Sequence, residues 1–214
     1  MIISDLEVKK LINNGSVKIE PYFETFQGPT TYYCHLGNKF LVMDETKLNN
    51  KDFVLDTNNI DNSYCKEIET NEPYIMKPNE FVLAQTFEKL SVDNEHIINY
   101  FNSSSLARLG ISQAALGFMP AGNGWKNGSL SVTLELINNS PFPIKLYPTI
   151  VDEKGNINFG TEILKISISK IFGQVSVSHD NWRYTVYATN NNVTRSKISN
   201  RFSNSNEIFN INKH

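Results

Sequence analysis

Short runs of alternating apolar and polar residues recur along most of this chain, and such runs are typical of β-strands. The clearest is Leu164–Ser169, within a predicted strand at 164–171, where every second residue is apolar, as on a half-buried strand. Turn signals such as Gly122-Asn123-Gly124 separate the runs. Similar runs, rich in branched residues, predict further strands at 39–42, 81–87, 130–137 and 144–147.

One amphipathic helix is predicted at the start of the chain. Ser4 and Glu7 have the spacing of a capping box, and Asn13-Asn14-Gly15 is a signal for the helix end. The apolar face predicted for this helix consists of Leu6, Leu11 and Ile12. Many short strands with few helices predict a mainly β fold, either a barrel or a sandwich.

The composition bounds the size and the surroundings of the protein. With 214 residues, 40% of them apolar, the chain can bury a core. We predict one domain over residues 1–189 and a mobile polar tail over 190–214. The formal charge of −2 argues against general nucleic-acid binding. No run approaches the ~18 apolar residues of a membrane span, and the polar start is unlike a signal peptide, so a cytoplasmic protein without membrane partners is predicted.

Three hydroxyls and one guanidinium gather around the predicted start of a short helix, at Ser103, Ser104, Ser105 and Arg108. The unpaired N–H groups at a helix start suit phosphate oxygens, and an arginine pairs with anions through a fixed fork. Gly110 is predicted to end this helix. The segment therefore indicates a site for an anionic ligand such as a nucleotide.

A single carboxylate lies among the apolar residues of the strand predicted at 130–137. Leu134 and Leu136 share one face of this strand, and Glu135 lies on the other face with Thr133. The simplest interpretation is a solvated glutamate on the outer side of a sheet. The alternative is a partly desolvated carboxylate, which would be a stronger proton acceptor suited to proton transfer.

The sequence Ser-Ser-Leu-Ala-Arg-Leu-Gly at 104–110, followed by Thr-Leu-Glu-Leu at 133–136, resembles the dCTP deaminase branch of the deoxyuridine-triphosphatase (dUTPase) superfamily. The resemblance implies a distorted β-barrel or jelly roll of the dUTPase-like type, with a short N-terminal helix and a few helical turns. It extends over roughly residues 1–170 through collinear segments at 1–5, 36–40, 80–86 and 143–148.

The resemblance implies hydrolytic deamination of dCTP to dUTP and ammonia. Glu135 would activate the water that attacks C4 of cytosine, Arg108 would stabilise charge at the reacting centre, and Ser104 would help to hold the water. An arginine at position 108 that only forms a structural ion pair is the alternative. The residues expected to bind the nucleotide are Ser103, Ser105, Trp125, Thr133, Leu134 and Lys197.

The resemblance also implies a homotrimer with sites between subunits, and a Mg²⁺ ion bound through the triphosphate rather than by protein side chains. No zinc is expected. Zinc-dependent nucleobase deaminases need a His or Cys ligand beside a glutamate and a Pro-Cys-x-x-Cys motif. Cys34 and Cys65 lie far apart and match no such motif, and they are expected to be reduced thiols.

Several positions depart from the family pattern. Ser103 stands where the family has an arginine, and residues 113–122 lack its histidine, threonine and sugar-binding aspartate. Tyr33 and His35 replace an early aspartate and arginine. Trp125 either stacks on a base or simply caps the mouth of the barrel.

The C-terminal tyrosine and lysine that close over the phosphates in the family have only an imperfectly spaced match. Lys197 is the best equivalent, with Tyr187 or Tyr184 upstream and Arg201 where a glutamine is usual. A solvated lysine on a loose tail is the alternative.

These departures leave open a nucleotide-binding sensor or sequestering protein that kept the fold and lost catalysis. The deaminase hypothesis itself includes an enzyme that continues to dUMP and pyrophosphate. A direct dUTP pyrophosphatase is disfavoured, because that branch uses an aspartate between the two segments and residues 111–134 contain none.

Overall fold

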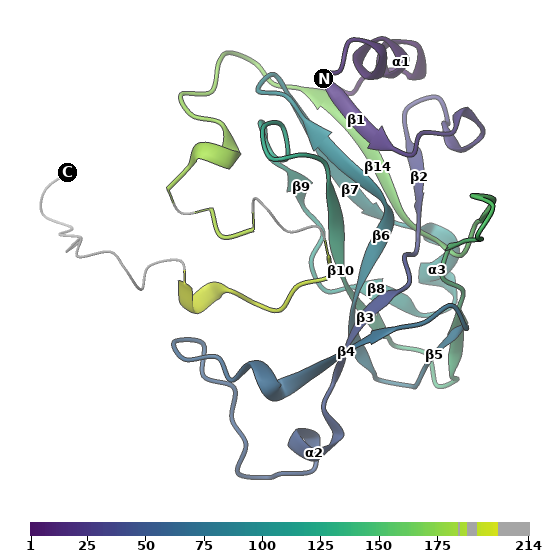
Figure 1. Cartoon of the computed structure of the whole chain (residues 1–214), viewed down its shortest axis with the longest axis vertical. Coiled ribbons are helices and arrows are strands. Elements are labelled where there is room, and N and C mark those ends of the chain that lie inside the picture. The colour runs from purple at the N-terminus through teal and green to yellow at the C-terminus, as the bar shows by residue number, and fades with distance from the viewer. Residues whose placement is uncertain (184, 188–191, 201–214) are drawn as a thin grey trace, which may run out of the picture.

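The computed structural model describes residues 1–183, 185–187 and 192–200, which form two antiparallel β-sheets with short helices around them (Figure 1). The larger sheet has the order β4-β3-β6-β10-β8, with β1 also paired to β6. Its strands are β1 (Val17–Glu20), β3 (Lys39–Met43), β4 (Cys65–Glu69), β6 (Phe81–Val92), β8 (Ile111–Gln113) and β10 (Leu130–Asn138). The second sheet, in the order β2-β14-β7-β9, consists of β2 (Tyr32–His35), β14 (Glu162–Lys170), β7 (His96–Asn102) and β9 (Phe118–Met119).

Two small ribbons and several short helices complete the described part of the chain. The ribbons pair β5 (Tyr74–Met76) with β11 (Ile144–Leu146) and β12 (Ile150–Val151) with β13 (Ile157–Asn158). The α-helices are α1 (Asp5–Asn13), α2 (Glu45–Leu48) and α3 (Ser104–Arg108). The 3₁₀ turns are η1 (Glu24–Phe26), η2 (Asn62–Tyr64), η3 (His179–Asn181) and η4 (Ile198–Asn200). None of the helices described is both long enough and apolar enough to span a bilayer.

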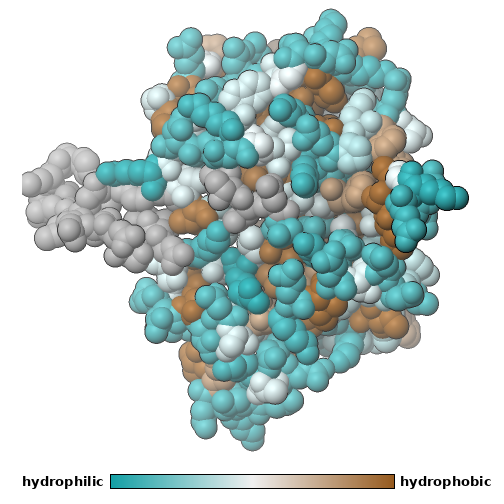
Figure 2. Space-filling model, viewed as in Figure 1, coloured by the Kyte–Doolittle hydropathy of each residue, from teal (hydrophilic) through white to brown (hydrophobic). Residues whose placement is uncertain are grey.

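The main core lies where apolar side chains of the two sheets meet. β6 and β10 contribute Leu90 and Leu134, and β7 and β14 contribute Ile98 and Ile166, all fully buried. Burial of apolar area between packed sheets is the dominant stabilising contribution in such a fold. The outer surface is mixed, and on the face shown in Figure 2 hydrophobic residues form scattered patches among polar ones. The mainly β fold predicted from the sequence is confirmed.

All five predicted strands form, and the longest extends beyond its predicted end. β6 continues to Val92 because its second half pairs with β1, where Val17 lies opposite Val92 and Glu20 opposite Lys89. A short run of sequence cannot show this, since the extension depends on a strand seventy positions earlier.

Two details of the predicted polar and apolar faces are wrong. In α1, Leu6 is 64% exposed and Val8 is the buried residue. The predicted capping box is also absent, since Ser4 makes no side-chain hydrogen bond at the N-cap and the Glu7 side chain pairs with Lys10. In β14, Ser167 is buried although it lies on the polar side of the alternation, since Asn99 of β7 covers it and donates to its Oγ at 3.2 Å.

A buried polar pair explains what His35 does in this fold. The backbone N–H of His35 donates to Glu88 Oε2 at 2.7 Å, and the ring Nδ1 of His35 lies 2.7 Å from Glu88 Oε1. Both side chains are fully enclosed. Glu88 is placed there by an irregularity in β6, where Thr86 Oγ1 donates to the Glu88 carbonyl and accepts from the Val132 N–H. The pair satisfies its own hydrogen bonds, so His35 has a structural role.

Gly110, which follows the C-cap of α3, is expected to tolerate substitution poorly. Its φ is +95°, and an added Cβ would lie 2.8 Å from the Ser140 nitrogen. Gly110→Ala should therefore lower the free energy of unfolding in urea by about 1–3 kcal/mol, since both the left-handed conformation and the contact oppose a side chain. Gly117→Ala is the control, because a Cβ there meets nothing within 4 Å. Equal losses in the two variants would contradict this expectation.

Candidate active site

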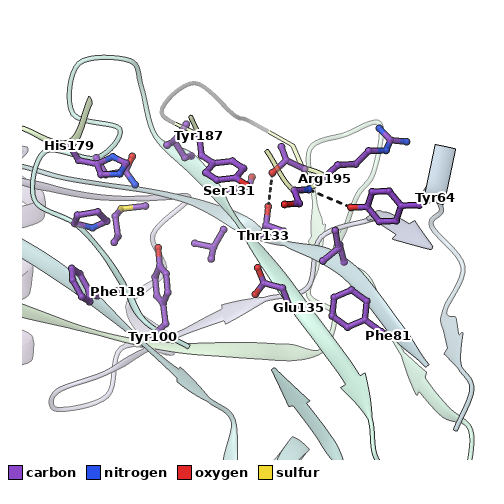
Figure 3. A pocket seen from close by; sticks show the side chains of 18 residues that line it. Tyr64, Phe81, Tyr100, Phe118, Ser131, Thr133, Glu135, His179, Tyr187 and Arg195 are labelled. Atoms are coloured by element: carbon purple, nitrogen blue, oxygen red, sulfur yellow. Dashed lines mark hydrogen bonds between the residues drawn. The ribbon is translucent and has the colours of Figure 1, made fainter. Parts of the chain in front are cut away.

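A cavity of about 570 Å³ opens beside β10, within the size range of small-molecule sites. Figure 3 shows Glu135 near its centre, with Phe81 and Tyr64 on one side and Tyr100, Phe118 and His179 on the other. The side chains that line it are mostly apolar or aromatic, with a few hydroxyl groups. Besides the six named, the lining residues are Leu83, Met119, Pro120, Asn123, Leu130, Ser131, Val132, Thr133, Tyr187, Thr194, Arg195 and Ser196.

Glu135 is the only carboxylate among these lining residues. Burial raises the pKa of its carboxyl above the ordinary value of 4.5, because the wall of the cavity solvates the charge less well than water does. The solvated glutamate on the outer side of a sheet, which the strand pattern alone favoured, is therefore not what the fold provides. A carboxylate held in this way suits proton transfer.

Tyr100 brings a hydroxyl to the same cavity from the second sheet. Burial, and to a lesser extent the nearby Cys34 and Glu135, raise the pKa of its phenol, so the group is neutral in the physiological range. Both sheets thus contribute a polar group to one largely apolar space, and each group is kept closer to its neutral form.

A C-terminal segment, residues 193–196, forms one wall of the cavity. The Val193 N–H donates to Gln85 Oε1 at 2.6 Å, and the hydroxyls of Thr194 and Thr133 lie 3.5 Å apart. Arg195 Nη2 donates to the Cys65 carbonyl at 3.1 Å. The polar composition of this region offered no sequence signal that it would pack against β4, β6 and β10.

The short helix predicted at the serine cluster forms, but it lies away from this cavity. Ser104, Ser105 and Arg108 are exposed, and none of them lines it. Ser103 is buried at the N-cap of α3 and makes no side-chain capping bond. Figure 1 shows α3 beside β8, on the other side of β10 from the C-terminal segment. Within one chain, Arg108 and Glu135 therefore do not converge.

The remaining candidate residues are divided between the cavity and its surroundings. Thr133 lines the cavity, whereas the Leu134 side chain is in the core. Trp125 is 38% exposed and lies outside the lining. The Lys197 N–H donates to the Tyr187 hydroxyl at 2.8 Å, and its Nζ donates to the Val186 carbonyl at 3.3 Å. Tyr184, Arg201 and most of the predicted tail lie outside the described residues.

No group of three or more His, Cys, Asp or Glu side chains suited to a metal ion occurs within the described ranges. Both cysteines are buried and free. His96 pairs with Asp93, its Nδ1 lying 2.8 Å from Asp93 Oδ1.

The chain thus has a two-sheet β fold and one partly desolvated carboxylate in a cavity of nucleotide size. Comparison with known proteins identifies its relatives. A family model described as dCTP deaminase-like matches residues 2–151. The dCTP deaminase, dUMP-forming, of Thermobifida fusca is 35% identical over 149 residues, which are 69% of this chain and 72% of that protein. Its counterpart in Sulfurihydrogenibium sp. is 33% identical over 150 residues, 69% of this chain and 78% of that protein. The chain therefore belongs to the dCTP deaminase-like family.

A solved structure supports the fold. The crystal structure of 2′-deoxycytidine 5′-triphosphate deaminase from Agrobacterium tumefaciens superimposes with a TM-score of 0.53 at 16% identity. The match covers 78% of this chain and 46% of that chain, so this chain corresponds to under half of the longer protein. The dUTPase-like fold implied by the sequence resemblance is confirmed. The family model ends before β14, so several cavity residues, including His179 and Thr194, lie beyond its matched range.

Proposed function

We propose that this chain catalyses the hydrolytic deamination of dCTP to dUTP and ammonia. The observation that supports this most directly is Glu135, a desolvated carboxylate in a cavity of suitable size, in a chain of the dCTP deaminase-like family. Glu135 takes a proton from a water molecule, whose oxygen then bonds to C4 of cytosine. That proton passes to the 4-amino group, and ammonia leaves. The second proton of the water moves from the C4 oxygen to N3, which gives the C4 carbonyl of uracil. The substrate carries Mg²⁺ on its triphosphate.

The serine cluster takes part, in this proposal, from a neighbouring subunit of a homotrimer. Arg108 and Ser104 are exposed on α3 of each chain, so both are available to a neighbouring subunit. Delivered to the Glu135 cavity of the next subunit, Arg108 would stabilise the negative charge that develops on the cytosine ring. Ser104 would hold the attacking water, and Ser105 would contact the phosphates.

Incubation with each deoxynucleoside triphosphate, followed by chromatography of the products, tests the proposal. Conversion of dCTP to dUTP is the expected result, and further conversion to dUMP would extend it to the second reaction named for the relatives. Binding without turnover would favour a sensor or sequestering protein, which the serine at position 103 and the substitutions across residues 113–122 support. If the protein neither binds nor converts any deoxynucleotide, the deaminase and the sensor hypotheses are both overturned.

The rate should depend on pH through Glu135. Only the carboxylate form accepts a proton from water, so kcat/KM should fall as the pH is lowered through the pKa of this group. Because burial raises that pKa, the midpoint should lie above 4.5, the ordinary value for a glutamate. A pH profile of kcat/KM for dCTP measures it. A rate that stays constant down to pH 4.5 would contradict this assignment.

A further inference from the structure

The residues that follow β14 hold one loop at the mouth of the cavity. This loop, residues 121–128, is called the mouth loop below. Asp180 of η3 accepts hydrogen bonds through both carboxylate oxygens, from the Gly124 N–H at 3.0 Å and from the Lys126 N–H at 3.2 Å. Two backbone donors separated by one residue thus share one carboxylate, which restrains the loop more than a single bond would.

Two further contacts bring the same segments together. The His179 N–H donates to the Ala121 carbonyl at 2.9 Å. Gly122 has a φ of +79°, and a Cβ on it would lie 2.5 Å from the Cβ of Ser178, so the segments approach closely. The Val92 N–H and the Asp93 carbonyl also bond this loop, at Asn123 and Gly122. Residues 178–180 hold it from the opposite segment, which lies outside the part of the chain that the family model matches.

Asn123 of the mouth loop lines the cavity that contains Glu135. Its Oδ1 is buried and has no hydrogen-bond partner among the described residues. A buried acceptor without a partner raises the free energy of the folded protein, and a ligand that donates a hydrogen bond to it removes that cost. Asn123 is thus suited to contact a donor group of a bound molecule.

We propose that Asp180 is a positioning residue for nucleotide binding, which holds the mouth loop so that Asn123 Oδ1 accepts a hydrogen bond from the 3′-hydroxyl of the deoxyribose. This inference rests on the proposed function. With ionised phosphates, dCTP carries only two kinds of hydrogen-bond donor, the 4-amino group and the 3′-hydroxyl. The reaction places the 4-amino group at Glu135, so the hydroxyl is the donor that remains for Asn123.

Calorimetry on the Glu135→Gln protein, which is expected to bind dCTP without turnover, separates the possibilities. Asn123→Ala and Asp180→Ala, each added to it, should weaken dCTP binding about tenfold, the size of one lost hydrogen bond in a binding site. Neither substitution should change the affinity for 2′,3′-dideoxy-CTP, which lacks the 3′-hydroxyl donor. The double variant should bind no more weakly than either single one, because Asp180 acts through Asn123. With Glu135 intact, Asp180→Ala should raise KM more than it lowers kcat.

Asp152→Ala is the matched control. Asp152 also accepts from two loop N–H groups, those of Lys154 and Asn156, but it lies outside the cavity lining. Asp180→Asn, which keeps one acceptor oxygen, should bind dCTP with intermediate affinity and serves if Asp180→Ala does not fold. Unchanged dCTP affinity, or equal losses for dCTP and the dideoxy analogue, would overturn the inference alone. A protein with Asp180 and Asn123 intact that binds no dCTP would overturn the proposed function and this inference with it.

Discussion

Glu135→Gln is expected to lower the rate of dCTP deamination by about 10³-fold, the contribution typical of a positioned general base. The amide has nearly the shape of the carboxyl group but cannot accept a proton from water. The affinity for dCTP should therefore change little, which calorimetry can measure on the inactive variant. Glu67→Gln, which neutralises an exposed carboxylate on β4, is the control and should leave the rate unchanged.

The stability of the same variant provides an independent check. A carboxyl whose pKa is raised on folding binds its proton more tightly in the folded chain than in the unfolded chain, so its charge opposes folding above that pKa. Near pH 7, Glu135→Gln should thus be at least as stable as the unsubstituted protein in urea unfolding. A clear loss of stability there would make the lost activity ambiguous, whereas retained wild-type activity would refute the role of Glu135 outright.

The sequence predicted the fold well because strands and turns leave local patterns. β10 and β14 follow from branched residues at alternate positions, and the end of α3 follows from a glycine that adopts a left-handed conformation. Which side chains of each strand or helix are buried was harder to predict. Ser167 is buried because Asn99 from another strand covers it, and that pairing depends on residues far away in the sequence.

The candidate site was predictable only in part. Glu135 could be singled out from its strand and from the family resemblance, and the structure places it in a cavity. No such signal indicated the wall formed by Thr194 and Arg195. The hydrogen bonds that the mouth loop donates to Asp180 had none either. They depend on where a polar C-terminal region folds back, and neither hydrophobic periodicity nor a known motif specifies this.

The separation of Arg108 from Glu135 within one chain leads to the second large effect. Arg108→Ala should by itself lower kcat for dCTP by about 10²–10³-fold, as expected for the loss of one group that stabilises developing charge. If the two residues meet across a subunit boundary, however, an assembly that contains both kinds of inactive chain has some complete sites. Each such site takes Glu135 from the Arg108→Ala chain and Arg108 from the Glu135→Gln chain.

Co-expression of the two variants with different affinity tags, and isolation of assemblies that carry both tags, tests this directly. Each trimer that carries both tags has one complete site among its three, so the selected preparation should regain about a third of the unsubstituted activity. The double variant Glu135→Gln/Arg108→Ala, co-expressed with the unsubstituted chain, controls for simple dilution of active subunits. If the mixed assemblies are no more active than either parent, the two residues do not form a site across a subunit boundary. A different cation would then have to stabilise the charge that develops when water adds to C4.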